Sequence, residues 1–274
     1  MAVLAHPDDE TFGMGGTLAV YAQKGVRVHL VCATRGEVGE ADANLLQGFS
    51  SVGALREHEL RCAAKKIGLA SVNFLGYRDS GMRGSPENQH PDALINAPID
   101  LVVKKIDHYF LKYQPQVIIT FDPLGGYMHP DHIAIQRATE KAFFKFHGNG
   151  KKISSDGYSP SKLYFHTFPH KTLKIILKIL PFFGLNPTQF GRNKDINLLD
   201  MVQQDFPITT RINYKNVMEI REQAFACHTS QGGGKKDNLI VTWLGRLSSK
   251  QDTFMRAFPP YDSKRVEKDL FDGI

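Results

Sequence analysis

Cysteine is scarce in this 274-residue chain, which contains only Cys32, Cys62 and Cys227. No two of them have C-x-x-C spacing, so we expect neither a disulfide framework nor a thiolate zinc site. Cys62 and Cys227 are expected to be unpaired packing residues. The scarcity favours a reducing compartment, and we expect a cytoplasmic protein. Any metal ion would then be bound by histidine and carboxylate side chains.

The chain also lacks a long apolar run and a long basic run. Its most apolar window, residues 173–183, is interrupted by Lys174, Lys178 and Pro181, whereas a membrane span needs about 20 apolar residues. Thirty-four Lys and Arg against 28 Asp and Glu give a formal net charge of +6, spread along the chain. We expect no transmembrane helix, no signal peptide and no nucleic-acid partner, while the positive charge suits an anionic substrate.

A glycine-rich dinucleotide-binding turn is missing as well. Such a site needs G-x-G-x-x-G directly after the first strand. Here residues 1–5 form the first apolar run, and it is followed by acidic residues, while Gly13, Gly15 and Gly16 fall inside the next helical pattern. Because those acids would repel a pyrophosphate, we do not favour a nucleotide-binding module.

What the sequence does contain is an alternation of strand-like and helix-like segments. Strands are predicted at residues 1–5, 26–34, 72–75, 117–121 and 163–167, and helices at 13–24, 52–67, 98–113 and 130–146. This order predicts an α/β fold with a mostly parallel sheet and flanking helices. The last third is less regular, with an extended segment predicted at 206–212 and a helix at 216–227. We find no internal repeat and expect a single domain.

Four chemically active side chains follow the first strand, namely His6, Asp8, Asp9 and Glu10. In open parallel sheets the carboxyl ends of the strands face the ligand crevice. A divalent metal would neutralise the carboxylates, and a histidine and a carboxylate three residues apart can reach one ion while the neighbouring acid stays free as a base. The structural alternative is a set of acids that caps a helix N-terminus.

A second cluster follows the fourth strand and contains Tyr127, His129, Asp131 and His132. Pro130 suits the first helical position, which places His132 in the first turn. In the strand order 3-2-1-4-5, strands one and four are neighbours, so both clusters would meet at one crevice. The pooled ligands would be His6, Asp9 and His132, with positions left open for water and substrate as in a catalytic site.

These motifs resemble the LmbE-like (PIG-L-type) zinc-dependent de-N-acetylases. The resemblance rests on A-H-P-D-D-E at residues 5–10 together with G-G-Y-M-H-P-D-H at 125–132. Supporting matches are T-R-G-E-V-G at 34–39, R-x-x-E-L-x-x-A at 56–63, R-D-S-G-M at 78–82 and H-T-S-Q at 228–231. The R-D-S-G-M stretch is similar to the branch of mycothiol-pathway deacetylases and conjugate amidases.

The resemblance implies a Rossmann-like fold, with a sheet core in the order 3-2-1-4-5 and an irregular C-terminal extension. Residues 1–145 would carry the catalytic frame, and 146–274 would supply substrate-pocket and C-terminal elements. The implied activity is removal of an acetyl or related acyl group from an N-acetylglucosamine-type sugar or conjugate. The implied cofactor is Zn²⁺, with Fe²⁺ as the alternative in the cell.

The resemblance also implies roles for single residues. His6, Asp9 and His132 would bind the metal, and Asp8 would be the general base. His129 and Tyr127 would stabilise the oxyanion, and Asp131 would hold His129 and favour its imidazolium form. Either Asp8 or His129 would protonate the leaving amine. Arg56, Asp79, Glu37 and His228 would contact the substrate, the structural alternative being ordinary helix-surface and loop residues.

One further segment, residues 171–184, has lysines at positions 171, 174 and 178 on one helical face. We expect a lid or packing helix over the site. The alternative is a basic amphipathic helix on a membrane surface, in which case the protein would deacetylate or bind a glycolipid such as a phosphatidylinositol sugar.

Overall fold

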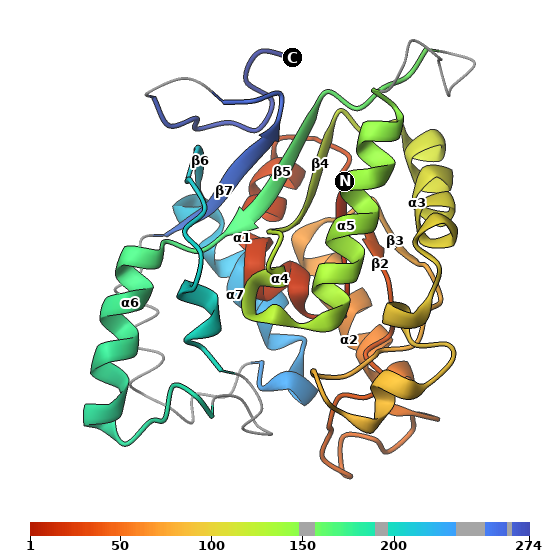
Figure 1. Ribbon diagram of the computed structural model, residues 1–274, viewed down its shortest axis with the longest axis vertical. Helices are drawn as coiled ribbons and strands as arrows, with labels where there is room; N and C mark the ends of the chain where they lie inside the picture. The colour runs from red at the N-terminus through yellow and green to blue at the C-terminus, as the bar shows by residue number, and fades with distance from the viewer. Residues whose placement is uncertain (148–156, 190–196, 234–249, 262–264) are drawn as a thin grey trace.

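The structure is a computed structural model that describes residues 1–147, 157–189, 197–233, 250–261 and 265–274 (Figure 1). Within these residues a seven-stranded sheet has the order β3-β2-β1-β4-β5-β7-β6. The strands are β1 (Ala2–Leu4), β2 (His29–Cys32), β3 (Ser71–Phe74), β4 (Val117–Phe121), β5 (Lys162–Thr167), β6 (Thr210–Asn213) and β7 (Gln251–Phe258). The first five are parallel, which confirms the predicted α/β fold and the order 3-2-1-4-5.

The sheet continues beyond the predicted core through β7 and β6, which pair antiparallel to β5 and to each other. The extended segment predicted at 206–212 overlaps β6, whereas β7 was not predicted. Most side chains of β7 are only partly buried, and Thr253 and Phe254 alone are fully buried. Its sequence, QDTFMRAF, mixes polar residues with apolar ones and contains no long apolar run for sequence analysis to detect.

Helices cover both faces of the sheet. They are α1 (Asp9–Gln23), α2 (Val52–Ile67), α3 (Ile99–Tyr113), α4 (Gly125–Met128), α5 (Pro130–Lys145), α6 (His170–Ile179) and α7 (Met218–Ala226). Figure 1 shows α3 and α5 in front of the sheet and α1, α2 and α7 behind it, and helices of each group contact one another. Short 3₁₀ turns connect them: η1 (Pro86–Gln89), η2 (Leu94–Asn96), η3 (Leu180–Phe183), η4 (Asp200–Val202), η5 (Lys215–Val217) and η6 (Thr229–Gln231).

Local signals explain where the central helices begin and end. The Ser51 hydroxyl accepts a hydrogen bond from the Ala54 amide at the start of α2, and Gly68 ends that helix in the left-handed conformation at φ 87°. Pro130 occupies the first turn of α5, and the His129 side chain caps it. These two helices match their predicted bounds to within one residue.

Buried side chains of β1, β2 and β4 form the centre of the core, among them Leu4, Val31 and Ile118. Because β1 and β4 are paired and parallel, the residues that follow them emerge side by side at one edge of the sheet. This pairing brings the two chemically active clusters of the sequence together.

Cys62 and Cys227 form a disulfide with a Cα–Cα distance of 5.8 Å, so the expectation of unpaired packing residues was wrong. The partners are 165 residues apart, and they meet because α2 and α7 pack against each other. Local cysteine spacing carries no signal for such a contact. Cys32 remains a buried free thiol. Because two of the three cysteines form a disulfide, the small number of cysteines no longer favours a reducing compartment.

The segment that includes α6 packs on η4, which in turn contacts α4. Leu177 and Leu180 are buried, while Ile175, Ile179 and Phe182 are exposed. The packing agrees with the expected covering helix, and the exposed apolar side chains suit the membrane-surface alternative, so both remain predictions. Among the described helices, none combines the length and the apolar character that crossing a membrane requires.

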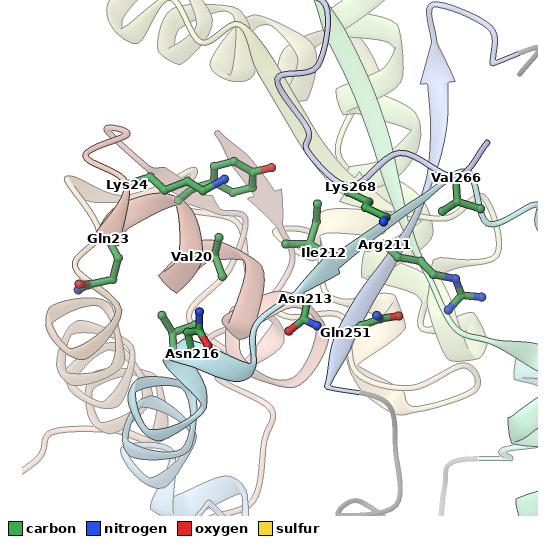
Figure 2. Close-up of a pocket in the computed structure, with 12 residues that line it drawn as sticks. Val20, Gln23, Lys24, Arg211, Ile212, Asn213, Asn216, Gln251, Val266 and Lys268 are labelled. Carbon is green, nitrogen blue, oxygen red and sulfur yellow. The ribbon is translucent and has the colours of Figure 1, made fainter.

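A pocket of about 560 Å³ lies between the C-terminal half of α1 and strands β6 and β7 (Figure 2). Its lining includes Lys24, Asn213 and Lys268. It is at the opposite end of α1 from Asp9 and contains none of the site residues predicted from the sequence.

Gly16 marks a close approach within the helical layer, and it yields the first prediction. A Cβ at this position would overlap the Tyr214 ring. Because Tyr214 precedes η5 and is fixed by backbone hydrogen bonds, we expect Gly16→Ala to lower the free energy of unfolding by about 1–3 kcal/mol, measured by urea denaturation. Gly15→Ala, whose Cβ would meet its nearest neighbour at 3.3 Å, is the control and should cost less. Equal stability of Gly16→Ala and the parent would contradict this packing.

Candidate active site

Only residues 5–8 separate the end of β1 from the start of α1, so the first acids of the helix lie at the carboxyl edge of the sheet. The Asp9 carboxylate accepts hydrogen bonds from the backbone amides of Ala5 at 3.2 Å and His6 at 2.7 Å. Asp8 precedes the helix with φ 127°, a left-handed conformation that costs a non-glycine residue free energy. Such a residue persists only where its surroundings hold it.

The three predicted metal ligands meet at this edge. His6 Nδ1 lies 3.2 Å from His132 Nε2, Asp9 Oδ1 lies 3.2 Å from the same Nε2, and Asp9 Oδ2 lies 3.7 Å from His6 Nδ1. All three side chains are buried. Two imidazole nitrogens and a carboxylate that converge in this way fit a divalent transition-metal ion.

The ring of His132 is fixed from two sides. Its Nδ1 lies 3.1 Å from the Gly125 carbonyl oxygen, and the ring stacks on Phe121 at a centroid distance of 3.9 Å. A backbone partner on one ring nitrogen sets the tautomer and leaves Nε2 available to a metal. The His132 side chain can approach this backbone closely because residue 125 is glycine: a Cβ at Gly125 would lie 2.8 Å from the Cβ of His132.

Charges around the cluster favour the ionised forms. Burial alone would raise the pKa of Asp9, but the charges and hydrogen bonds of His132 and His6 hold it well below its usual range. Burial alone would likewise lower the pKa of His6, but Asp79, Asp131 and Asp9 raise it well above its usual value. A negative Asp9 and a positive His6 are therefore favoured, and these opposite charges face each other within the cluster.

Asp131 does not hold His129 through its carboxylate as expected. Its Oδ2 lies 3.1 Å from His6 Nε2 and accepts a hydrogen bond from the Ser80 amide at 2.9 Å. His129 Nδ1 instead accepts the backbone amide of Asp131 at 3.2 Å, as the cap of α5. The first helical turn thus directs the Asp131 side chain to His6 and its amide to His129.

The expected imidazolium form of His129 is not favoured either. Burial, together with the charges of His6 and His132, lowers the pKa of His129 well below its usual value. With Nδ1 as an acceptor, the proton of the neutral ring is on Nε2. The Tyr127 ring lies 5.9 Å from that of His129, and burial with the charges of Asp9 and Asp8 raises the pKa of its phenol, which stays protonated.

Further potential ligands surround His6. Single donor atoms of His6, His129 and His132 lie within 4.8 Å of one another, and so do those of His6, Asp79 and Asp131. The second group uses the opposite nitrogen of His6, since Asp79 Oδ1 is 3.5 Å from Nε2. Two candidate metal groups therefore share one imidazole.

Arg56 faces Asp8 rather than an open pocket. Its Nη2 lies 3.1 Å from the Asp8 carboxylate and donates to the Pro7 carbonyl at 2.8 Å, and Nη1 donates to the Gly36 carbonyl at 3.1 Å. Burial and Asp9 still raise the pKa of Asp8 to about 6 against the lowering charge of Arg56. The Asp8 side chain is 19% exposed, whereas that of Asp9 is 9% exposed, so Asp8 is the more accessible carboxylate.

The other expected substrate contacts also have partners inside the protein. Glu37 accepts the Asp79 amide at 3.1 Å, and Asp79 accepts the Gly81 amide at 2.8 Å. His228 is fully buried with Nε2 2.6 Å from Glu10. Asp79 and His228 thus lie behind the cluster, and the sequence reading missed the contacts that hold them there. The R-D-S-G-M and H-T-S-Q motifs were the only sequence signals for Asp79 and His228, and they indicated no partner for either side chain.

Comparisons with known proteins show the family of this chain. Residues 1–143 match the PIG-L family, described as GlcNAc-PI de-N-acetylase. The chain belongs to this family. It is 35% identical over 240 residues, 84% of this chain and 78% of the relative, to the 1D-myo-inositol 2-acetamido-2-deoxy-alpha-D-glucopyranoside deacetylase of Acidothermus cellulolyticus. As a PIG-L family member it is a hydrolase that acts on an amide.

Solved structures show how widely the fold is shared. N,N'-diacetylchitobiose deacetylase from Pyrococcus horikoshii superposes with a TM-score of 0.60 at 20% identity, over 93% of this chain and 82% of that one. GalB, the 4-carboxy-2-hydroxymuconate hydratase from Pseudomonas putida KT2440, superposes with a TM-score of 0.59 at 18% identity, over 96% and 98%. Because one of these is a hydratase, the fold alone does not define the reaction.

The contact between Arg56 and Asp8 gives the second prediction. Arg56→Leu leaves a largely buried carboxylate and two carbonyls without their donor, so we expect the free energy of unfolding to fall by about 3 kcal/mol. In an Asp8→Asn background the same substitution should cost less, because no charge is left unpaired. The measurement is a double-mutant cycle by urea denaturation. Equal costs in the two backgrounds would mean that Arg56 does not act on the Asp8 carboxylate.

Proposed function

We propose that this protein is a zinc-dependent hydrolase that removes an acetyl or related acyl group from the amide nitrogen of an N-acetylglucosamine-type sugar conjugate. The observation that carries the proposal is the convergence of His6, Asp9 and His132 beside the accessible carboxylate of Asp8. The family and the name of the Acidothermus relative support the reaction and the substrate class.

His6, Asp9 and His132 would hold the metal, since their donor atoms converge and each side chain is kept in place by a further contact. When bound, the ion supplies a Lewis acid that polarises the amide carbonyl and lowers the pKa of water to about 7. Two nitrogens and one oxygen suit Zn²⁺ and also Fe²⁺. Asp131 and Asp79 on the far nitrogen of His6 would orient its ring.

Asp8 would act as general base. Its carboxylate would take a proton from the attacking water, for which a pKa near neutrality is suitable. Arg56 would orient that carboxylate through its hydrogen bond to Asp8 Oδ2. After attack, Asp8 would pass the proton to the leaving amine. His129 is the less suitable proton donor, because its lowered pKa leaves its ring neutral.

His129 and Tyr127 would stabilise the carbonyl oxygen as its negative charge develops. Neutral His129 carries a proton on Nε2, and the Tyr127 hydroxyl stays protonated. Both rings lie within 6 Å of His6 or His132 by centroid distance. The loss of one such donor typically costs about 2.7–4 kcal/mol of transition-state stabilisation.

Metal content provides the third prediction. The protein purified without chelator should hold about one zinc per chain, measured by inductively coupled plasma mass spectrometry. His132→Ala should lose it, because one of two imidazole ligands is removed. His108→Ala, an exposed histidine on α3, is the matched control and should keep it. Full zinc occupancy in His132→Ala would show that the proposed ligand set is wrong.

Turnover provides the fourth prediction. The zinc-loaded protein should release acetate from an N-acetylglucosamine–inositol conjugate, and Asp8→Asn should lower kcat by about 10²-fold or more while it retains zinc. Acetate and free amine are quantified for soluble conjugates and, in a parallel arm, for an N-acetylglucosaminyl phosphatidylinositol in vesicles. A preference for the vesicle arm would favour the membrane-surface alternative. Loss of zinc in Asp8→Asn would overturn the base assignment.

A further inference from the structure

Glu10 and His228 form a buried carboxylate–imidazole contact beside the Asp8 backbone, and neither residue takes part in the mechanism above. Glu10 and His228 have fully buried side chains, and His228 Nε2 lies 2.6 Å from Glu10 Oε1. The second oxygen, Glu10 Oε2, accepts the backbone amide of Asp8 at 3.0 Å. His228 is thereby linked through one carboxylate to the backbone of the proposed base.

The backbone of Asp8 needs such a contact. Its φ of 127° is unfavourable for a residue with a Cβ. Arg56 holds the carbonyl of Pro7 and the carboxylate of Asp8, while Glu10 holds the amide between them. A buried Glu10 carboxylate without a partner would be costly, and His228 Nε2 supplies that partner at 2.6 Å.

The position of His228 is itself fixed by α2. The preceding residue, Cys227, is bonded to Cys62 on that helix. Two residues further on, the Ser230 amide and hydroxyl donate to Glu59 at 2.7 and 2.6 Å, and the Thr229 hydroxyl donates to it at 2.8 Å. Both sides of His228 are therefore anchored to the helix that also carries Arg56.

We propose that Glu10 and His228 form a positioning pair, which holds the backbone of Asp8 so that its carboxylate is directed at the reacting water. The role rests on the proposed function of Asp8 as base. The pair touches neither substrate nor metal in this account. It acts through Asp8 alone, and its loss should impair the chemical step rather than substrate binding.

The test combines a contact measurement with kinetics on the full chain. Amide hydrogen exchange at Asp8 is followed by NMR on the protein and on Glu10→Gln and His228→Gln, with the Thr34 amide, bonded to the Ala5 carbonyl, as internal reference. In parallel, kcat and KM are measured with the soluble conjugate, and zinc content is determined. Ser230→Ala, which weakens only the anchor, is the milder variant if His228→Gln does not fold.

Asp252→Ala is the matched control. Asp252 is a carboxylate that accepts the Thr17 amide and hydroxyl of the same helix α1 at 2.7 and 2.8 Å. Its removal costs stability at a similar type of contact without touching Asp8. Its melting temperature should fall with kcat unchanged, which separates general loosening of α1 from loss of position at Asp8.

We expect both pair variants to speed exchange at Asp8 but not at Thr34, because the hydrogen bonds that link His228 to the Asp8 backbone run through Glu10. Their kcat should fall by about 10- to 100-fold, with KM within about threefold and zinc retained. The Glu10→Gln/His228→Gln double variant should have a kcat no lower than that of the less active single variant.

Unchanged exchange at Asp8 in His228→Gln overturns the pair whatever the activity. Faster exchange with an unaltered kcat overturns its catalytic role, whereas a parent protein inactive on every conjugate refutes the proposed function and leaves the contact itself established by exchange.

Discussion

Three acids in succession at the end of a buried strand are the constraint on which the rest of this structure depends. Asp8, Asp9 and Glu10 cannot be buried together unless each carboxylate has a cationic or hydrogen-bonding partner. Each has its own: Asp9 lies against His6 and His132, Asp8 against Arg56, and Glu10 against His228.

His6 precedes α1, while the other partners come from α5, α2 and the segment after α7. The neutralisation of one strand end therefore fixes the relative positions of distant parts of the chain. The segment after α7 lies beyond residue 145, the end of the frame expected from sequence, yet His228 contacts Glu10 next to the site and Ser230 contacts Glu59 on α2. The C-terminal part therefore contributes to the site's internal support, while the division of the chain into 1–145 and 146–274 stays a prediction.

The alternation of strands and helices predicted a doubly wound sheet with the core order 3-2-1-4-5. The meeting of His6, Asp9 and His132 followed from that order, because these residues come after the neighbouring strands one and four. The sequence could not predict that Asp131 faces His6 or that Arg56 faces Asp8, since those contacts depend on side-chain direction within a helical turn. The Cys62–Cys227 disulfide and β7 were missed for a related reason, because both depend on contacts between segments far apart in the chain. The shared fold of a deacetylase and a hydratase makes the same point about function: the reaction follows from the side chains at the strand ends.

The most direct test of the account is to locate the metal. His6 offers Nδ1 to Asp9 and His132, and Nε2 to Asp79 and Asp131, so two alternative positions exist on opposite sides of one ring. Anomalous diffraction at the zinc absorption edge from crystals of the zinc-loaded protein distinguishes them. The account predicts one anomalous peak in contact with His6 Nδ1, Asp9 and His132. A peak between His6 Nε2, Asp79 and Asp131, or none at this edge of the sheet, would contradict it.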